Sequence, residues 1–139
     1  MSQENVKIYE RLFDEYWAKD DEGVLETFVA QNHINHTLGV QGPEGYKEFM
    51  KPFRVGLPDF HFEIHFNLSD GDYVVTVWTG VGTHTGEFMG VPATGKMVRF
   101  NGTCIARFEK GIVVEEWSYP DLMGLMQQIA PTPQAEAVA

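Results

Sequence analysis

The chain has 139 residues, of which 43% are hydrophobic and 13% aromatic, and its formal net charge at pH 7 is −10. This length predicts one domain with a core and with apolar surface left over to line a pocket. Asp and Glu number 20 against 10 Lys and Arg. The charge balance argues against nucleic-acid binding and against an anionic membrane surface, because both require clustered positive charge.

Cys104 is the only cysteine, which excludes an intrachain disulfide and a Cys-based zinc cluster. The first residues lack the basic and apolar regions of a signal peptide, and no window is apolar enough to span a membrane. We therefore expect a cytoplasmic protein. Residues 1–130 are expected to form the single domain. Residues 131–139, which contain two prolines and no apolar period, are expected to form a loosely held C-terminal tail.

Hydrophobic residues in the first part of the chain recur at spacings of three and four, which is typical of helices with one buried stripe. A first helix is predicted over residues 4–19. A second, shorter helix begins after the candidate caps Asp20 and Asp21. A third opens at residues 42–44, where a proline occupies the first turn.

From Phe60 onward the hydrophobic period changes to two, which indicates strands. Further strands are predicted over residues 73–84, 97–108 and 112–119, joined mostly by tight turns. Two faces of the first strand are predicted: Phe60, Phe62, Ile64 and Phe66 on one, and His61, Glu63 and His65 on the other. The expected fold class is α+β, with N-terminal helices packed on the concave face of a strongly curved, mainly antiparallel sheet that encloses a blind funnel.

The most specific pattern lies in the last third of the chain. A Gly-rich region at residues 82–96 is followed by a strand to Phe108, and then by residues 111–125, which include Glu115-Glu116-Trp117, Asp121 and Gly124-Leu125. This order resembles the SnoaL-like polyketide cyclase family, a branch of the nuclear-transport-factor-like superfamily. The resemblance implies a cone-shaped α+β barrel roll, an aldol-type cyclase without cofactor or metal, and pairing of two chains through the outer face of the sheet.

Asp121 falls where the cyclases of that family carry their catalytic acid/base, so the resemblance implies that it transfers the proton. It follows the apolar group Trp117, Tyr119 and Pro120. A carboxylate turned into the funnel would be poorly solvated, and burial favours its protonated form. The spacing also fits a different role, in which Asp121 caps a short helix that begins at the next residue.

His84 and His36 match positions that family members turn toward the cavity mouth. A neutral imidazole there could hydrogen-bond a substrate carbonyl and support enolisation by Asp121. His84 is therefore a second catalytic candidate, and His36 is a substrate-binding candidate. The alternative is that each histidine satisfies backbone groups at a bend.

Trp17, Trp78, Phe100, Cys104 and Trp117 are predicted to contact the substrate, because flat apolar side chains suit a planar guest. The alternative is that they only fill the core. Cys104 shares the apolar side of its strand with Phe100, which indicates a small buried hydrophobe rather than a nucleophile. Many relatives carry a polar residue at this position, so a partner of the catalytic carboxylate is missing.

His61, Glu63 and His65 share a strand face, and alternate strand residues can ligate one metal. A solvated sheet face explains them as well, and His33 and His36 form a similarly weak pair. No metal site is predicted.

The leading hypothesis is a cofactor-independent enzyme that binds an apolar, carbonyl-bearing small molecule and uses Asp121 for an intramolecular aldol condensation. The same carboxylate could instead activate water for hydration or hydrolysis. A third hypothesis is a non-catalytic carrier of a small ligand, because one fold serves many functions. We expect a homodimer, to whose contact the His61-Glu63-His65 face and Arg99, Thr103 and Arg107 could contribute.

Overall fold

The computed structural model describes residues 2–130, so the predicted C-terminal tail at residues 131–139 lies outside the described residues. Its elements, in chain order, are α1 (Ser2–Arg11), the π-helix η1 (Leu12–Trp17), α2 (Glu22–Phe28), β1 (Val29–Asn35), β2 (Val40–Gln41), α3 (Gly42–Gly56), β3 (His61–Asp70), β4 (Tyr73–Thr83), β5 (Met97–Glu109), β6 (Ile112–Pro120) and α4 (Leu122–Ile129). No helix in this part of the chain is long and apolar enough to cross a membrane.

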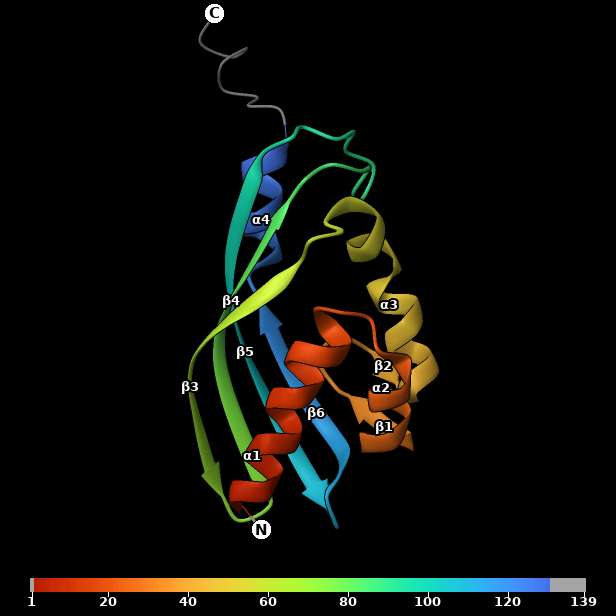
Figure 1. Cartoon of the computed structure of the whole chain (residues 1–139), viewed down its shortest axis with the longest axis vertical. Coiled ribbons are helices and arrows are strands. Elements are labelled where there is room, and N and C mark those ends of the chain that lie inside the picture. The colour runs from red at the N-terminus through yellow and green to blue at the C-terminus, as the bar shows by residue number, and fades with distance from the viewer. Residues whose placement is uncertain (1, 131–139) are drawn as a thin grey trace, which may run out of the picture.

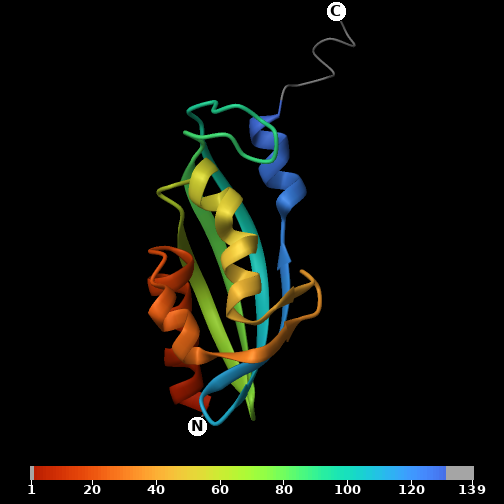
Figure 2. The ribbon, with the colours of Figure 1, turned by 90° about the vertical axis from the view of Figure 1, so that its right-hand side faces the viewer.

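The strands form one mixed, unclosed sheet in the order β2-β1-β6-β5-β4-β3. All neighbours are antiparallel except β1 and β6, which run parallel. Figures 1 and 2 show α1 and α3 over one face of this sheet and α4 near one of its ends. The predicted α+β class, with helices on one face of a mainly antiparallel sheet, is confirmed. The strands β1 and β2 were not predicted.

The first predicted helix changes its winding halfway. It is α-helical to Arg11 and continues as η1, whose buried residues are Leu12, Phe13, Tyr16 and Trp17. The guanidinium group of Arg54 in α3 donates to the backbone oxygens of Tyr16 (2.7 Å) and Trp17 (2.6 Å). The bond to Trp17 satisfies a carbonyl group at the end of the helix, and the bond to Tyr16 adds a second donor to an oxygen that also accepts from the backbone N–H of Asp20 (2.7 Å). Turns of π-helix are frequent at functional sites.

A β-bulge in β3 reverses the direction of its last side chains. The pairing with β4 shifts between Ile64 and Phe66, and the extra residue moves Phe66 to the outer face, where it is 50% exposed. The prediction that Phe66 shares a face with Phe60 and Phe62 is therefore wrong.

The strands β5 and β6 decide which side chains face the helices. On β5 the buried positions alternate and include Phe100, Gly102 and Cys104. Because Cys104 lies opposite Ser118, the inward positions of β6 are Glu116 and Ser118, and both are buried. Trp117 and the residues two positions apart from it therefore face outward.

Candidate functional site

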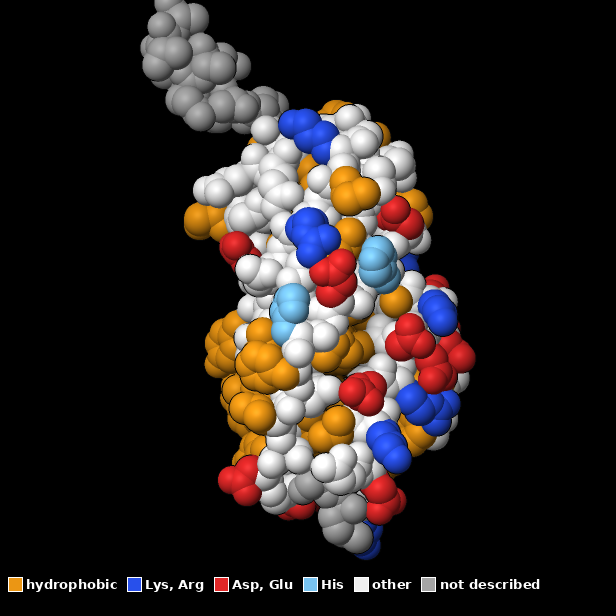
Figure 3. Space-filling view, turned by 60° about the vertical axis from the view of Figure 1, so that its left-hand side comes forward, with side chains coloured by type: hydrophobic (Ala, Val, Ile, Leu, Met, Phe, Trp, Pro, Cys, Tyr) orange, Lys and Arg blue, Asp and Glu red, His pale blue; other side chains and the backbone are white. Residues whose placement is uncertain are grey.

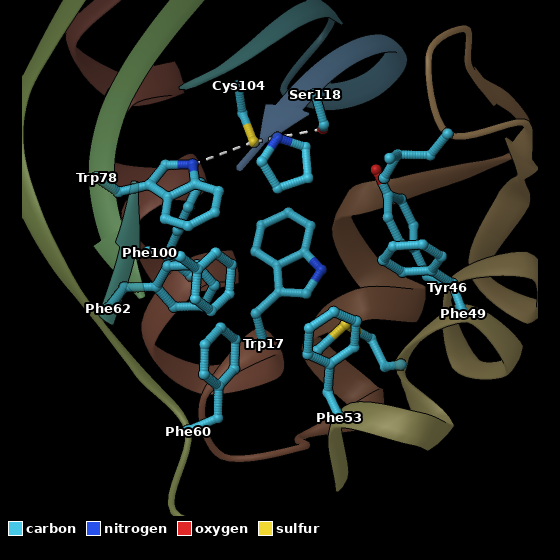
Figure 4. Close-up of a pocket in the computed structure, with 14 residues that line it drawn as sticks. Trp17, Tyr46, Phe49, Phe53, Phe60, Phe62, Trp78, Phe100, Cys104 and Ser118 are labelled. Carbon is cyan, nitrogen blue, oxygen red and sulfur yellow. Dashed lines mark hydrogen bonds between the residues drawn. The ribbon is translucent and has the colours of Figure 1, made fainter. Parts of the chain in front are cut away.

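An apolar pocket of about 60 Å³ lies between the helices and the inner face of the sheet. Its walls come mainly from η1, α3 and strands β4 to β6 (Figure 4). The lining residues are Phe13, Trp17, Leu38, Tyr46, Phe49, Met50, Phe53, Phe60, Phe62, Trp78, Phe100, Cys104, Ser118 and Pro120. The pocket therefore has mainly aromatic walls.

Four of the predicted site residues line this pocket: Trp17, Trp78, Phe100 and Cys104. The Phe100 ring stacks on a neighbouring wall residue, Phe60, at 5.7 Å between centroids and 6° between planes. The indole ring of Trp78 packs closely against Gly102, where an added Cβ would stand only 2.1 Å from Cζ2 of the indole. Gly102 is thus required for the observed position of Trp78.

One patch of the pocket wall is polar. The Sγ atom of Cys104 accepts a hydrogen bond from Nε1 of Trp78 (3.4 Å) and donates one to Oγ of Ser118 (3.3 Å), as the dashed lines in Figure 4 show. Burial, together with the negative charge of Glu116, raises the pKa of the Cys104 thiol to about 12. A thiol with this pKa is protonated at neutral pH and is a poor nucleophile.

Asn35 orients the Ser118 hydroxyl group of the polar patch. Its Oδ1 atom accepts hydrogen bonds from the backbone N–H groups of Thr37 (3.2 Å) and Leu38 (3.0 Å). Because these donors fix the oxygen, the amide nitrogen faces the other way. It donates to the hydroxyl oxygens of Tyr46 (2.8 Å) and Ser118 (2.9 Å).

A buried carboxylate lies at the centre of this network. Glu116 is fully buried and accepts hydrogen bonds from the hydroxyl groups of Tyr9 and Tyr46, the latter at 2.6 Å. Nε2 of His33 lies 2.9 Å from the same carboxylate. Since the backbone N–H of Gly42 donates to Nδ1 of His33 (3.3 Å), the hydrogen of the neutral ring is on Nε2, which donates to Glu116. Burial and the charge of Glu116 raise the pKa of Tyr9 and of Tyr46 well above the usual range.

This network was not predicted from the sequence. The apolar Trp117 of β6 was expected to contact the substrate, whereas the polar Glu116 and Ser118 are the residues that point inward. The turn between β5 and β6 could have indicated how the two strands pair. Lys110 and Gly111 both have positive φ (51° and 75°), and they close a tight turn that sets the register of the pairing. A bulge opposite Arg107 and Phe108 then shifts that register, and no residue type in the chain announces it.

Asp121 does not face the apolar pocket. It is exposed and caps α4, with its Oδ1 atom accepting from the backbone N–H of Gly124 (2.8 Å). Its side chain borders a separate, open groove of about 400 Å³ on the outer side of the sheet, together with Asn101 and Tyr119. The expectation of a poorly solvated carboxylate in the funnel is wrong in this structure, and the capping alternative is observed. Asp121 follows Trp117 and Tyr119 at intervals of two residues, so it lies on the same, outward-facing side of the chain.

The other three predicted site residues also lie away from the pocket lining. His84 is buried, and its Nδ1 accepts from the backbone N–H of Thr94 (3.2 Å). His36 is half-exposed, lies 2.8 Å from Glu115 through Nε2, and stacks on Trp117 with 5.1 Å between centroids. The structure therefore does not place His84 and His36 at the pocket mouth, and it does not place Trp117 in its wall. Trp117 faces outward because it alternates with the inward residues Glu116 and Ser118 on β6. Local polar partners hold the two histidines.

Among residues 2–130, no group of three His, Cys, Asp or Glu side chains stands ready to hold a metal ion. On the predicted His61-Glu63-His65 face, Glu63 forms an ion pair with Arg99 (2.5 Å). His65 contacts the hydroxyl group of Thr79 (2.7 Å).

Fold and pocket together define a small α+β protein of the curved-sheet type, with an aromatic pocket under its helices. The model of the family described as SnoaL-like polyketide cyclase matches residues 7–129. The chain therefore belongs to the SnoaL-like polyketide cyclase family.

Relatives and solved structures agree with this assignment. DauD, an aklanonic acid methyl ester cyclase of Streptomyces sp. (strain C5), is 26% identical over 140 residues, covering 93% of this chain and 85% of DauD. The crystal structure of a candidate SnoaL-like polyketide cyclase from Jannaschia sp. CCS1 is 28% identical with a TM-score of 0.83, covering 94% and 95% of the two chains. AclR, a candidate hydroxylase of Streptomyces galilaeus, also gives a TM-score of 0.83 over 99% and 91% of the chains. Its 22% identity shows the fold alone.

Proposed function

We propose that this chain is a cofactor-independent enzyme that closes a ring in an apolar, carbonyl-bearing small molecule by intramolecular aldol condensation. The pocket is the observation that carries the proposal: aromatic rings surround it, and the hydroxyl and thiol groups of Ser118 and Cys104 lie in its wall. Such a lining suits a mostly apolar ligand with a few polar atoms. The family assignment and the likeness to DauD, which is named as an aklanonic acid methyl ester cyclase, support the reaction class.

The reaction needs a base and a folded substrate. The base takes a proton from a carbon next to a carbonyl, and the enolate carbon then bonds to a second carbonyl carbon of the same molecule. The new alkoxide takes up a proton, so no atoms are added from outside. Apolar walls favour the folded shape of a flexible substrate and so bring the two reacting carbons together.

We propose Asp121 as the base. Pro120 lines the pocket, and its neighbour Asp121 is therefore at the rim. The bond to the N–H of Gly124 holds the carboxylate away from the pocket, so this role requires that the bond break and that the start of α4 rearrange to bring the carboxylate to the pocket. The pocket also has to widen, because about 60 Å³ is small against the roughly 300–1,000 Å³ of usual ligand pockets. The partly exposed lining residues Leu38 and Phe49 are the side chains that we expect to move.

Asp121→Asn tests this assignment cleanly, because Asn caps a helix as well as Asp does. We expect the variant to keep its melting temperature and ligand affinity and to lose roughly 10²- to 10⁴-fold in turnover. Asp121→Ser is the matched control, since it also caps α4 and also lacks a carboxylate. Full turnover in Asp121→Asn would end the role of Asp121.

The first compound to assay is aklanonic acid methyl ester, because DauD is named for it. Mass spectrometry separates the possible reactions: ring closure by the aldol step leaves the mass unchanged, loss of water after ring closure lowers it by one water, and hydration raises it by one water. Oxygen-18 from solvent in the product would favour the hydratase or hydrolase alternative.

One observation favours a second function, that of a non-catalytic carrier of a small ligand. The Asp121 carboxylate is exposed and occupied with capping α4. A carrier binds ligand in the aromatic pocket without forming product, and Asp121→Asn then changes nothing that can be measured.

We also propose that two copies pair through the outer face of the sheet. The strand registers place two rows of side chains there: Phe66, Val77, Thr103 and Tyr119, and Leu68, Val75, Ile105 and Trp117. Figure 3 shows hydrophobic side chains gathered on this side of the molecule, and Leu68 is 60% and Tyr119 55% exposed. An apolar surface of this kind is typical of an interface.

Sedimentation equilibrium tests the pairing. Leu68→Glu should shift the protein to monomer, because it places charge in the middle of the apolar rows. Met123→Glu on α4 is the control, since Met123 is 73% exposed and lies off the sheet. A monomeric parent protein would exclude the pairing.

A further inference from the structure

The polar patch of the pocket wall contains one more hydrogen than it has acceptors. Ser118 and Cys104 each carry a single hydrogen on oxygen or sulfur. The Oγ atom of Ser118 already accepts from the amide of Asn35 (2.9 Å), and the Sγ atom of Cys104 already accepts from the indole of Trp78 (3.4 Å). Both acceptors therefore have a donor of their own.

One contact of 3.3 Å joins Sγ of Cys104 to Oγ of Ser118, and it uses one of the two hydrogens. Tyr9 also interacts with the Cys104 thiol, whereas no described residue accepts a hydrogen bond from the Ser118 hydroxyl. The thiol donates in this contact, so the remaining hydrogen is that of the Ser118 hydroxyl. A hydroxyl is also the stronger donor of the two.

This hydroxyl faces the place where a ligand binds. Ser118 and Cys104 both line the apolar pocket and are 8% and 7% exposed. The surrounding wall consists of rings such as those of Trp17, Phe62 and Phe100, as Figure 4 shows. These rings offer no strong acceptor, and a buried donor without an acceptor is unfavourable. An acceptor atom on the ligand would satisfy it.

The orientation of the hydroxyl is fixed by its neighbours. Asn35 is locked by the backbone N–H groups of Thr37 and Leu38 and can present only its amide nitrogen to Ser118. Ser118 therefore cannot turn its hydrogen toward Asn35. Donors occupy the sides of the Ser118 oxygen that face Asn35 and Cys104, so its hydrogen is available to an acceptor in the pocket.

We propose that the Ser118 hydroxyl, positioned by Asn35, donates the hydrogen bond that anchors a carbonyl oxygen of the ligand in the aromatic pocket. The ligand class is an aromatic or polycyclic ketone, ester or quinone, in which the carbonyl oxygen meets Ser118 and the apolar body contacts the rings. This inference rests on the proposed function only in taking the pocket as the substrate site. Ser118 is a binding residue and does not transfer the proton.

The test compares two small probes of similar shape, acetophenone and ethylbenzene, which differ in one carbonyl oxygen. Their affinities are measured by NMR titration of the full chain, with the indole N–H signals as reporters. Trp17, Trp78 and Trp117 are the only tryptophans, and the Trp78 signal reports directly on the patch because this N–H donates to Cys104. The measured quantity is the ratio of the two affinities, which removes differences in hydrophobicity when variants are compared.

Ser118→Ala should shift this ratio against acetophenone by roughly fivefold to tenfold, the worth of one buried hydrogen bond. Cys104→Ala should leave it within about twofold, because the hydroxyl and its Asn35 contact remain. Ser118→Cys is the second serine variant: it keeps an acceptor for Asn35 and the packing while weakening the donor, so it should shift the ratio in the same direction even if Ser118→Ala folds poorly.

An unchanged ratio in the serine variants would overturn the proposal. So would a shift in Cys104→Ala without one in Ser118→Ala, because the thiol would then be the donor. Failure of both probes to bind would remove the pocket as a carbonyl site. The assay measures binding alone, so it separates the two proposals: a shifted ratio together with full turnover in Asp121→Asn leaves the anchor standing and removes Asp121 as the base.

Discussion

Glu116 is the acceptor on which three buried donors depend. It is fully buried and receives the hydroxyl groups of Tyr9 and Tyr46 and the Nε2 hydrogen of His33. Glu116→Ala removes the acceptor and leaves these donors unpaired, at about 1–3 kcal/mol each. The total of about 3–9 kcal/mol is comparable with the whole stability of a typical domain, about 5–15 kcal/mol. We expect this variant to be largely unfolded or to unfold at very low urea concentration.

Two further variants make this reasoning refutable by urea unfolding, followed by circular dichroism. Glu116→Gln keeps one carbonyl oxygen for Tyr46 and His33, and the Tyr9 hydroxyl can turn to accept from the amide, so it should lose only about 1–3 kcal/mol. Adding Tyr9→Phe to Glu116→Ala removes one unpaired donor and should restore about 1–3 kcal/mol. A loss below about 1 kcal/mol in Glu116→Ala, or no recovery in the double variant, would refute the view that Glu116 satisfies these donors.

Two other predictions concern stability. Gly102→Ala should lower the free energy of unfolding by about 1–3 kcal/mol and shift the NMR signal of the Trp78 indole, because the new Cβ would meet the indole at 2.1 Å. Adding Trp78→Phe to this variant should recover part of the lost stability. An unchanged indole signal in Gly102→Ala would contradict this. Stability should also fall above about pH 8.5, because the raised pKa values of Cys104, Tyr9 and Tyr46 mean that the unfolded chain, with ordinary values near 8.5 and 10, loses protons first. Each group contributes about 1.4 kcal/mol per pH unit between its unfolded and folded pKa, so a urea midpoint constant from pH 8 to pH 11 would contradict the burial of these groups.

The helices and long strands could be predicted from periodicity, because burial of one face dominates those segments. Asp21 is the cap of α2, and the third helix begins at Gly42. The strand β1 escaped prediction for a physical reason. Its buried residues include His33 and Asn35, which are inward only because Glu116, Tyr46 and Ser118 provide partners from other elements.

The same reason explains the mixed outcome at the site. The rule that apolar residues point inward holds on β5, where Phe100 and Cys104 line the pocket. On β6 it fails, because the outer face is itself apolar and the inner face holds the polar network. Trp117 was therefore assigned to the wrong face, and Ser118 was overlooked. A bulge and a hydrogen-bond network are both tertiary features, and a single sequence does not display either.

The position of Glu116 in the chain has a consequence for synthesis on the ribosome. Tyr9, His33 and Tyr46 are translated long before it, and Tyr9 is separated from Glu116 by 107 residues. Until β6 leaves the exit tunnel, these donors in α1, β1 and α3 lack their acceptor and β1 has no parallel partner. The N-terminal half therefore cannot complete its core early, and the nascent chain reaches its native packing only once nearly the whole domain has emerged.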